Sequence, residues 1–197
     1  LVNGFFFFVM ALIFPLYSVA WHRIFLVQTE NLVIKDYYKW RYRHWYFLWA
    51  NIKIVLLIMP IVLGGFAITL ASFVLAPVVG IFLIFFVSIC YARLSMWLPA
   101  AALDNKIEFS DVLLLTKGNG WQLAAILIIT GLTTGLLERL ALGIIITASK
   151  SIGVIGDLTQ SLITSWAIYI IMYAGMAVGI TALSLAYRKL TKHLNYI

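Results

Sequence analysis

The stretch from Ile54 to Ala92 contains no charged residue over 39 positions. A helix needs only about 20 apolar residues to cross the ~30 Å hydrocarbon core of a bilayer, so one straight helix here would be about twice too long. Two helices joined by a tight turn fit better. Ser72 and Pro77 are the strongest helix breakers in this stretch, and they predict a turn between Ala71 and Pro77.

The rest of the chain is also suited to lipid. Only 11% of the residues are charged and 64% are hydrophobic, whereas a soluble domain carries about 25% charged residues. A water-soluble protein of 197 residues could not bury that much apolar surface. We therefore expect an all-α, polytopic membrane protein with one transmembrane domain, about five spans and additional interfacial helices. The spans are predicted at residues 2–20, 54–71, 74–92, 121–137 and 161–187.

Three segments between the spans are predicted to lie at the membrane surface. Lys35–Ala50 is rich in aromatic residues and reads as an interfacial helix that runs into the next span. Glu108–Lys117 reads as a short amphipathic piece. The apolar run within Leu140–Gln160 is too short to cross, so we expect an interfacial or re-entrant segment there, after Glu138 and Arg139 end the fourth span.

The basic residues are unevenly distributed between the two predicted sides. One side holds twelve Lys and Arg residues and the other holds only Arg139 and Lys150. Cytoplasmic loops carry such an excess, so the basic side is predicted to be the cytoplasmic side. Most tryptophans fall at the same boundary, where indole rings prefer to lie: Trp21, Trp40, Trp45, Trp49, Trp97 and Trp121.

This orientation accounts for the formal net charge of +7 without a nucleic-acid partner. It places the start of the first predicted span outside. An additional span upstream would make six, and we expect both termini of the full-length protein to face the cytoplasm.

No enzyme signature is present, and no catalytic residue is predicted. None of the seven acidic residues falls in the middle of a predicted span, where a carboxylate would suggest an ion path. The motifs of zinc proteases, serine hydrolases and phosphate-binding loops are absent from the sequence. Cys90 is the single cysteine, so it forms neither an internal disulfide nor a metal site. No cofactor is predicted.

A group of basic residues at the inner boundary is the main candidate binding site. Anionic lipid headgroups attract Lys and Arg at this level. The alternative is that these residues only set the orientation and extend their side chains towards water. Arg93, with Arg41 or Arg43, is the strongest candidate for a headgroup or an acidic partner, and Asp104 and Glu108 are the competing internal partners. The full candidate set is Arg23, Arg41, Arg43, Arg93 and Lys117.

Two other residue groups suggest weaker hypotheses. His22 and His44 lie on the predicted inner side and could together hold a haem, pigment or metal, although interfacial histidines are commoner than ligands. Gly131 and Gly135, and likewise Gly175 and Gly179, have the spacing that lets helix backbones approach closely. Packing within the chain is the favoured reading of these glycines, and contact with a partner chain is the alternative.

Four sequence runs together resemble a loose group of bacterial multi-pass membrane proteins of uncharacterised function. They are AWHRIFL (20–26), KWRYRHWYFLWA (39–50), YARLSMWLPAAALDN (91–105) and TKGNGWQL (116–123). That group is similar to the membrane domain found with some glycerophosphodiester phosphodiesterases. The resemblance covers roughly residues 15–130. It implies a helical protein of the bacterial inner membrane, commonly with six spans. It does not imply phosphodiesterase activity, because the catalytic domain has no counterpart here.

The sequence favours a non-catalytic membrane subunit or scaffold that packs against other membrane chains and against inner-leaflet lipid, which we expect to be anionic. A transporter or lipid-handling component is the first alternative, and it would depend on an interrupted helix in the 140–160 segment. A subunit carrying haem or pigment is the second alternative, and it would depend on His22 and His44.

Overall fold

The computed structural model describes residues 2–27, 39–152 and 157–193. Within these ranges every regular element is an α-helix, as predicted from the composition. The helices in chain order are α1 (Val2–Leu26), α2 (Tyr42–Ala71), α3 (Ala76–Leu94), α4 (Trp97–Ala102), α5 (Phe109–Leu115), α6 (Gly120–Ile152) and α7 (Asp157–His193).

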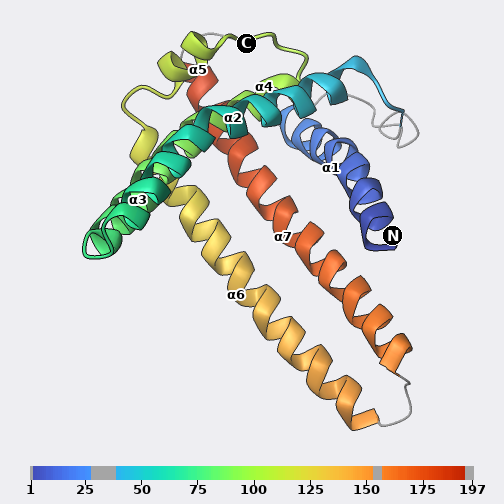
Figure 1. The fold of residues 1–197 in the computed structure, drawn as a ribbon. Coiled ribbons are helices and arrows are strands. Elements are labelled where there is room, and N and C mark those ends of the chain that lie inside the picture. The colour runs from blue at the N-terminus through green and yellow to red at the C-terminus, as the bar shows by residue number, and fades with distance from the viewer. Residues whose placement is uncertain (1, 28–38, 153–156, 194–197) are drawn as a thin grey trace.

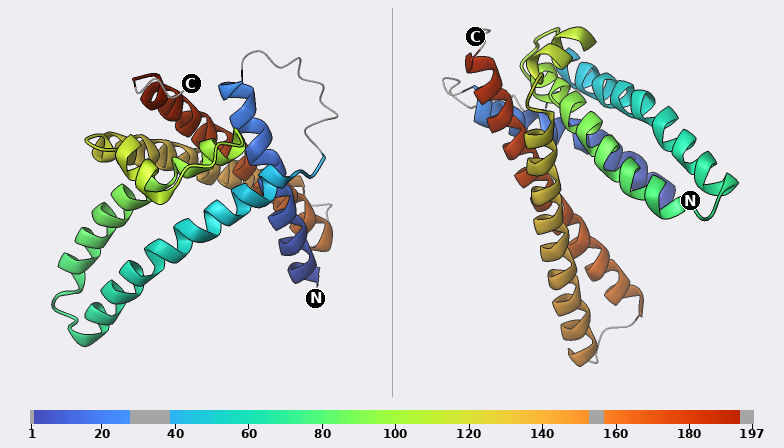
Figure 2. Two further views of the ribbon diagram at one scale, coloured as in Figure 1. Left: turned by 90° about the horizontal axis from the view of Figure 1, so that it is seen from above. Right: turned by 90° about the vertical axis from the view of Figure 1, so that its left-hand side faces the viewer.

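The long helices form two hairpins and one single arm. α2 and α3 are antiparallel neighbours, and so are α6 and α7, while α1 packs against α7. α3 also contacts α6, which joins the two hairpins near one end. Away from that end the hairpins diverge, so the fold is splayed rather than a closed bundle (Figures 1 and 2).

One end of the molecule holds the helices together. We call it the polar cap: α4, the 103–108 connection, α5 and the turn at 116–119. All six residues of α4 are buried, and its three alanines, Ala100 to Ala102, let α1, α2 and α7 approach closely. The principal hydrophobic core gathers around α4, with Phe47 and Ile54 from α2 among its fully buried members.

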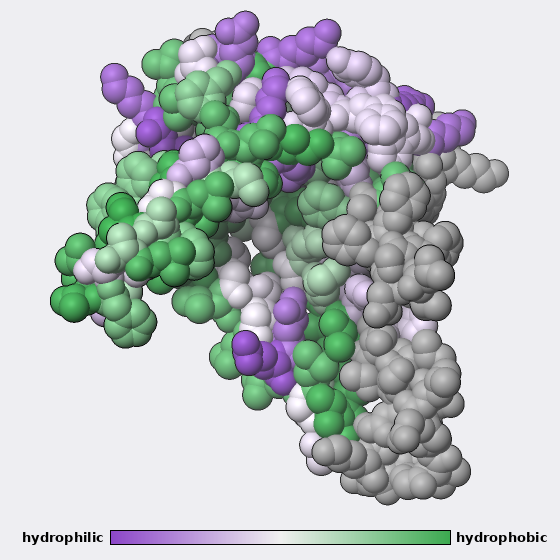
Figure 3. All heavy atoms as spheres, in the orientation of Figure 1, coloured by the Kyte–Doolittle hydropathy of each residue, from purple (hydrophilic) through white to green (hydrophobic). Residues whose placement is uncertain are grey.

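Four helical stretches are long and apolar enough to cross a membrane. They are Tyr42–Ala71, Ala76–Ala102, Gly120–Ala148 and Ile168–Lys192, and Leu12–Leu26 adds a shorter apolar helix among the described residues. Apolar side chains cover the α2–α3 hairpin, and polar ones gather at the polar cap (Figure 3). The predicted class, a multi-pass helical membrane protein, is confirmed at this level.

Local signals set several helix ends as predicted. α2 ends at Ala71 and α3 begins at Ala76, so the predicted turn is confirmed, with Pro77 in the first turn of α3. Of the predicted Lys35–Ala50 helix, the part from Tyr42 is continuous with the second span as expected, residues 39–41 precede the helix, and 35–38 lie outside the described residues. The amphipathic piece is α5, and it begins where the Asp111 carboxylate accepts the backbone N–H of Glu108 at 2.8 Å. Gly118 follows it with φ +78°, a conformation that favours glycine.

Two helices continue beyond the predicted spans. α1 continues to Leu26 rather than ending near residue 20. α6 does not end at Glu138 and Arg139 but runs through them to Ile152, so residues 140–152 are not a separate interfacial or re-entrant segment. Glu and Arg are good helix formers, and a charged pair alone does not stop a helix. The 153–156 part of that predicted segment lies outside the described residues, and α7 begins at Asp157.

Candidate functional site

Asp104 connects three helices within the polar cap. It follows α4 in a left-handed conformation with φ 62°. The N–H of Asn105 donates to the Ala100 carbonyl at 3.0 Å and the N–H of Asp104 to Ala101 at 3.2 Å, which is the Schellman pattern of a helix end. Glycine usually takes this position, but Asp tolerates it.

The Asp104 carboxylate then pairs with two arginines. Arg43 Nη2 of α2 lies 3.1 Å from Asp104 Oδ2, and Arg23 Nη1 of α1 lies 3.8 Å from the same oxygen. Arg23 Nη1 also donates to the Ala102 carbonyl at 3.2 Å. These two predicted headgroup residues therefore make contacts inside the protein that fasten α1 and α2 to the end of α4.

Arg93 has a different internal role. Its Nε donates to Thr116 Oγ1 at 3.0 Å and its Nη2 to the Leu113 carbonyl at 2.8 Å. A guanidinium at the C-terminal end of a helix satisfies carbonyls that lack helical partners. The side chain also packs closely over Gly120. That Arg93 binds a headgroup or acidic partner stays a prediction: two of its donors, Nε and Nη2, bond to the end of α5, and neither Asp104 nor Glu108 is among these internal partners.

The remaining two candidate cations lie apart. Arg41 precedes α2 and is exposed, with its backbone N–H donating to His44 Nδ1 at 2.9 Å. Lys117 is exposed in the turn between α5 and α6. The five predicted cations therefore do not form one site. Two of them contact Asp104, one bonds to the C-terminal end of α5, and two lie at separate surface positions.

His22 belongs to the contact between α1 and α7. Its Nδ1 lies 2.8 Å from Ser184 Oγ, and one residue earlier Trp21 Nε1 donates to Thr181 Oγ1 at 2.9 Å. The His22 ring is buried, and within the described part of the chain neither its Nε2 nor the Ser18 hydroxyl one turn earlier has a hydrogen-bond partner. Because Nε2 is sealed from solvent, a haem or pigment could reach it only if the helices moved apart.

His22 and His44 have separate environments. His44 Nδ1 accepts the backbone N–H of Arg41 at the start of α2, and the His44 ring packs on Trp40 with 5.4 Å between ring centroids. In the described ranges no group of three or more His, Cys, Asp or Glu side chains could hold a metal ion. The arrangement therefore lends no support to a shared ligand site.

Aromatic rings and lysines lie close together where the first turns of α2 contact the polar cap. Lys53 Nζ lies 5.3 Å from the Trp97 ring centroid and 5.9 Å from that of Trp49, and Lys106 Nζ lies 6.0 Å from that of Tyr42. The Trp97 indole donates to the Ile107 carbonyl at 2.9 Å. Trp45 and Trp49 are exposed on α2, an arrangement typical of a membrane–water boundary.

The four glycines with helix-packing spacing do not behave alike. A Cβ built at Gly175 would lie 2.9 Å from Glu138 Oε1 and 3.3 Å from the Thr134 Cβ, so α6 and α7 approach closely there. No described atom comes within 4 Å of a Cβ at Gly131, Gly135 or Gly179. Close packing within the chain is therefore seen at Gly175, and contact with a partner chain stays the alternative for the other three positions. Gly65, which was not in the set, packs against Leu83 of α3.

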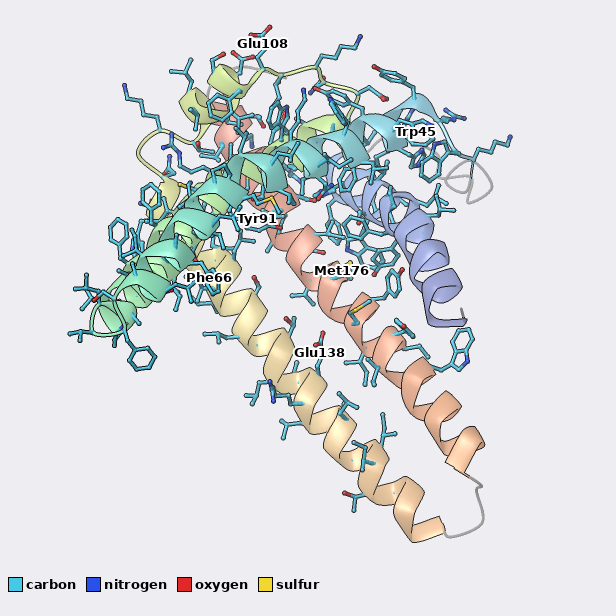
Figure 4. All side chains as sticks on the ribbon, in the orientation of Figure 1. Trp45, Phe66, Tyr91, Glu108, Glu138 and Met176 are labelled. Carbon is cyan, nitrogen blue, oxygen red and sulfur yellow. The ribbon has the colours of Figure 1, made fainter. Side chains whose placement is uncertain are left out.

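The sequence analysis missed the position of Glu138 and Arg139. Because α6 continues past them, they lie inside a long apolar helix instead of at its end. A polar patch is visible part-way down the α6–α7 hairpin, where Glu138 is labelled (Figures 3 and 4). Its carboxylate lies against Gly175 of α7. The sequence placed the charged pair at the end of a span, but it did not indicate that the helix continues beyond it.

The sequence analysis also missed a cavity of about 560 Å³ beside the polar cap. It lies between the α4–α5 connection, α5 and the end of α7. Its lining combines opposite charges, an amide and hydroxyls with aliphatic side chains: Asn105, Lys106, Ile107, Asp111, Leu114, Leu115, Tyr187 and Thr191. No sequence pattern points to it, because three separate segments form it.

Comparison with known proteins does not assign the chain to a family. No family model matches it, and no significant match was found among curated proteins or solved structures. The resemblance to bacterial multi-pass membrane proteins therefore stays an expectation, and function has to be argued from the geometry.

Proposed function

We propose that this chain is a non-catalytic subunit or scaffold of the bacterial inner membrane, which packs against other membrane proteins and inner-leaflet lipid. One observation carries the proposal. The α6–α7 hairpin continues as apolar helix well beyond Glu138 and Arg139, with large hydrophobic side chains exposed along it. An exposed apolar surface of this kind is typical of a contact with another membrane protein.

The length of α6 supports this view. Trp121, at its start, suits one membrane boundary. Glu138 follows 17 positions later, which at 1.5 Å per residue is roughly 26 Å and close to the thickness of the hydrocarbon core. The charged pair then lies near the opposite headgroups. The helix continues from Arg139 to Ile152, about 20 Å further.

The part of α6 after Arg139 lies beyond the hydrocarbon core, so its exposed apolar side chains would contact water unless another protein packs against them. Leu140 is 57% exposed and Ile144 70% exposed, and both lie on the face of α6 that carries Gly143, Thr147 and Ala148. Small residues let another helix approach closely. The distal hairpin is therefore the preferred contact for a partner membrane chain.

The splayed fold agrees with a scaffold. Only 11% to 22% of the residues in each candidate span are buried within the chain. The polar cap is extensively bonded and fixes the helices at one end, which leaves their apolar faces available to lipid and to neighbouring chains. The basic side chains around the polar cap suit anionic lipid of the inner leaflet.

Site-specific crosslinking tests the proposal. A photoreactive residue at Leu140 or Ile144 in the full chain, expressed in its native membrane, is expected to give a protein adduct. The same residue at Ala124, which is fully buried on α6, is the matched control and should give none. Adducts with lipid alone at both exposed positions would contradict a subunit role.

A lipid-handling role is the second candidate, and the cavity beside α5 and α7 favours it. The interrupted helix on which a transporter would depend is not found at residues 140–152, which continue α6. The haem or pigment alternative has less support, because His22 Nε2 is enclosed and His44 contacts the start of α2.

A further inference from the structure

The cavity beside the polar cap has the size of a small-ligand site. Its volume of about 560 Å³ falls within the range of pockets that hold small molecules and lipid headgroups. The 105–107 connection and α5 form one wall, and Tyr187 and Thr191 of α7 form the other. All of these elements are anchored, since α5 is held by Arg93 and Tyr187 is buried.

The charges that line the cavity are balanced. Lys106, whose Nζ also lies 6.0 Å from the Tyr42 ring centroid, supplies one positive charge, and Asp111 supplies one negative charge. No ion pair is recorded for either residue in the described part of the chain, and both are exposed. The Asp111 carboxylate would repel a ligand that carries only a negative charge. The Lys106 ammonium would repel a ligand that carries only a positive charge. A zwitterion can satisfy both.

The hydrogen-bonding groups indicate which zwitterion fits. Asp111 Oδ2 accepts the Glu108 N–H, which leaves Oδ1 for a ligand. The Thr191 hydroxyl donates to the Tyr187 carbonyl at 3.0 Å, so its lone pairs remain acceptors. A primary ammonium brings three N–H donors to such acceptors, whereas a quaternary ammonium brings none and prefers aromatic faces. Tyr187 is the only aromatic residue of the described lining.

The aliphatic part of the lining suits an acyl chain. Ile107, Leu114 and Leu115 add apolar surface next to the polar groups. Leu114 is 66% exposed, so this wall continues onto the outer surface of α5. An amphipathic helix of this kind at a membrane boundary gives a headgroup access from the bilayer.

We propose that this cavity binds a phospholipid whose headgroup carries a primary amine, as ethanolamine phospholipids do. Asp111 and Thr191 accept hydrogen bonds from the ammonium, and Lys106 pairs with the phosphate. The acyl chains leave past Ile107 and Leu114. This inference rests on the lipid contact in the proposed function, and it names the lipid class and the residues.

The test uses the full chain in nanodiscs made from equal parts of phosphatidylethanolamine, phosphatidylcholine and phosphatidylglycerol. The protein is then taken into mild detergent, and the retained lipids are quantified by mass spectrometry. We expect phosphatidylethanolamine to be retained several-fold over the other two. Asp111→Asn should remove most of this preference and bring the retention of the three lipids close to equal, because it removes a charge-assisted hydrogen bond.

Asp111→Asn is suitable because the amide oxygen can still accept the Glu108 N–H and preserve the start of α5. Lys106→Gln tests the contact with the phosphate. Glu108→Gln is the matched control for Asp111→Asn, and Lys117→Gln is the matched control for Lys106→Gln, because neither control residue lines the cavity. Both controls should retain the preference. Equal retention of the three lipids, a preference for phosphatidylglycerol, or an unchanged preference in Asp111→Asn would overturn the proposal.

Soluble phosphoethanolamine separates the headgroup from the lipid. It should displace the retained lipid only weakly, because it lacks acyl chains, and displacement as strong as that by the lipid would overturn the lipid assignment. The crosslinks expected at Leu140 and Ile144 do not depend on Asp111. Failure of the lipid site and failure of the subunit role are therefore separate results.

Discussion

Arg43 and Asp104 form an ion pair across the polar cap, with 3.1 Å between Nη2 and Oδ2. The same aspartate occupies a left-handed position at the end of α4 and lies 3.8 Å from Arg23. One side chain thus ends a buried helix and holds two membrane helices to it. The backbone conformation and the charge of Asp104 therefore contribute separately to the stability of the fold.

Substitution of Asp104 should separate them. Asp104→Asn keeps a residue that tolerates positive φ but removes the charge, so it should destabilise the fold through Arg23 and Arg43. Asp104→Ala adds the left-handed penalty, about 1 kcal/mol more. Thermal unfolding in detergent measures both variants. Equal stability of the two variants would show that backbone strain at residue 104 is unimportant.

The neighbouring glycines Gly64 and Gly65 provide a matched pair for the α2–α3 contact. A Cβ at Gly65 would collide with Leu83, while no described atom lies near a Cβ at Gly64. Gly65→Val should therefore cost roughly 1–3 kcal/mol through overpacking, and Gly64→Val should have little effect. Leu83→Ala should partly rescue Gly65→Val in a double-mutant cycle of unfolding free energies. Without rescue, the steric explanation fails.

Arg93 should be poorly replaced by lysine. A lysine ammonium cannot reproduce both the Thr116 and the Leu113 bonds in the geometry of the guanidinium. We expect Arg93→Lys to lose about 1 kcal/mol of local stability, seen as faster amide hydrogen exchange in residues 109–120. Arg139→Lys, at an exposed position, serves as the control. Unchanged exchange in Arg93→Lys would contradict the helix-capping role.

Cysteine labelling tests the membrane orientation. In a Cys90→Ser background, single cysteines replace Lys106, Lys117, Lys192 or Arg139. An impermeant maleimide should label Arg139→Cys in spheroplasts and the other three only after the membrane is opened, because twelve basic residues are predicted to face the cytoplasm. Labelling of Arg139→Cys and Lys117→Cys from the same side would invalidate the proposed placement of α6.

Sequence patterns predicted helices best where a physical helix breaker was present. Ser72 and Pro77 located the turn between α2 and α3, because proline at the start of a helix is favoured and within it is costly. Glu138 and Arg139 misled the prediction, because charge limits a span but does not end a helix. A charged pair in an apolar run therefore does not predict where a helix ends.

The candidate site was less predictable. Its cations were identified, but their partners depend on which helix ends meet, and Arg23 and Asp104 are far apart in the sequence. A run of alanines followed by Asp104 and Asn105 could have suggested a left-handed helix end, since both residue types tolerate it. The cavity had no such signal, because α5 and α7 meet there only after the chain has folded.

The contact between α1 and α7 has a consequence for biogenesis. Tyr17 donates to the Tyr173 carbonyl, Trp21 to Thr181, and His22 lies beside Ser184, so α1 binds α7, which is synthesised only after the five helices between them. During translation α1 must therefore remain in the bilayer with polar groups lacking their final partners while both hairpins are inserted. Polar groups without partners are costly in the hydrocarbon core, so α1 is destabilised there until α7 arrives. Chains truncated before α7 should accordingly be degraded rather than accumulate.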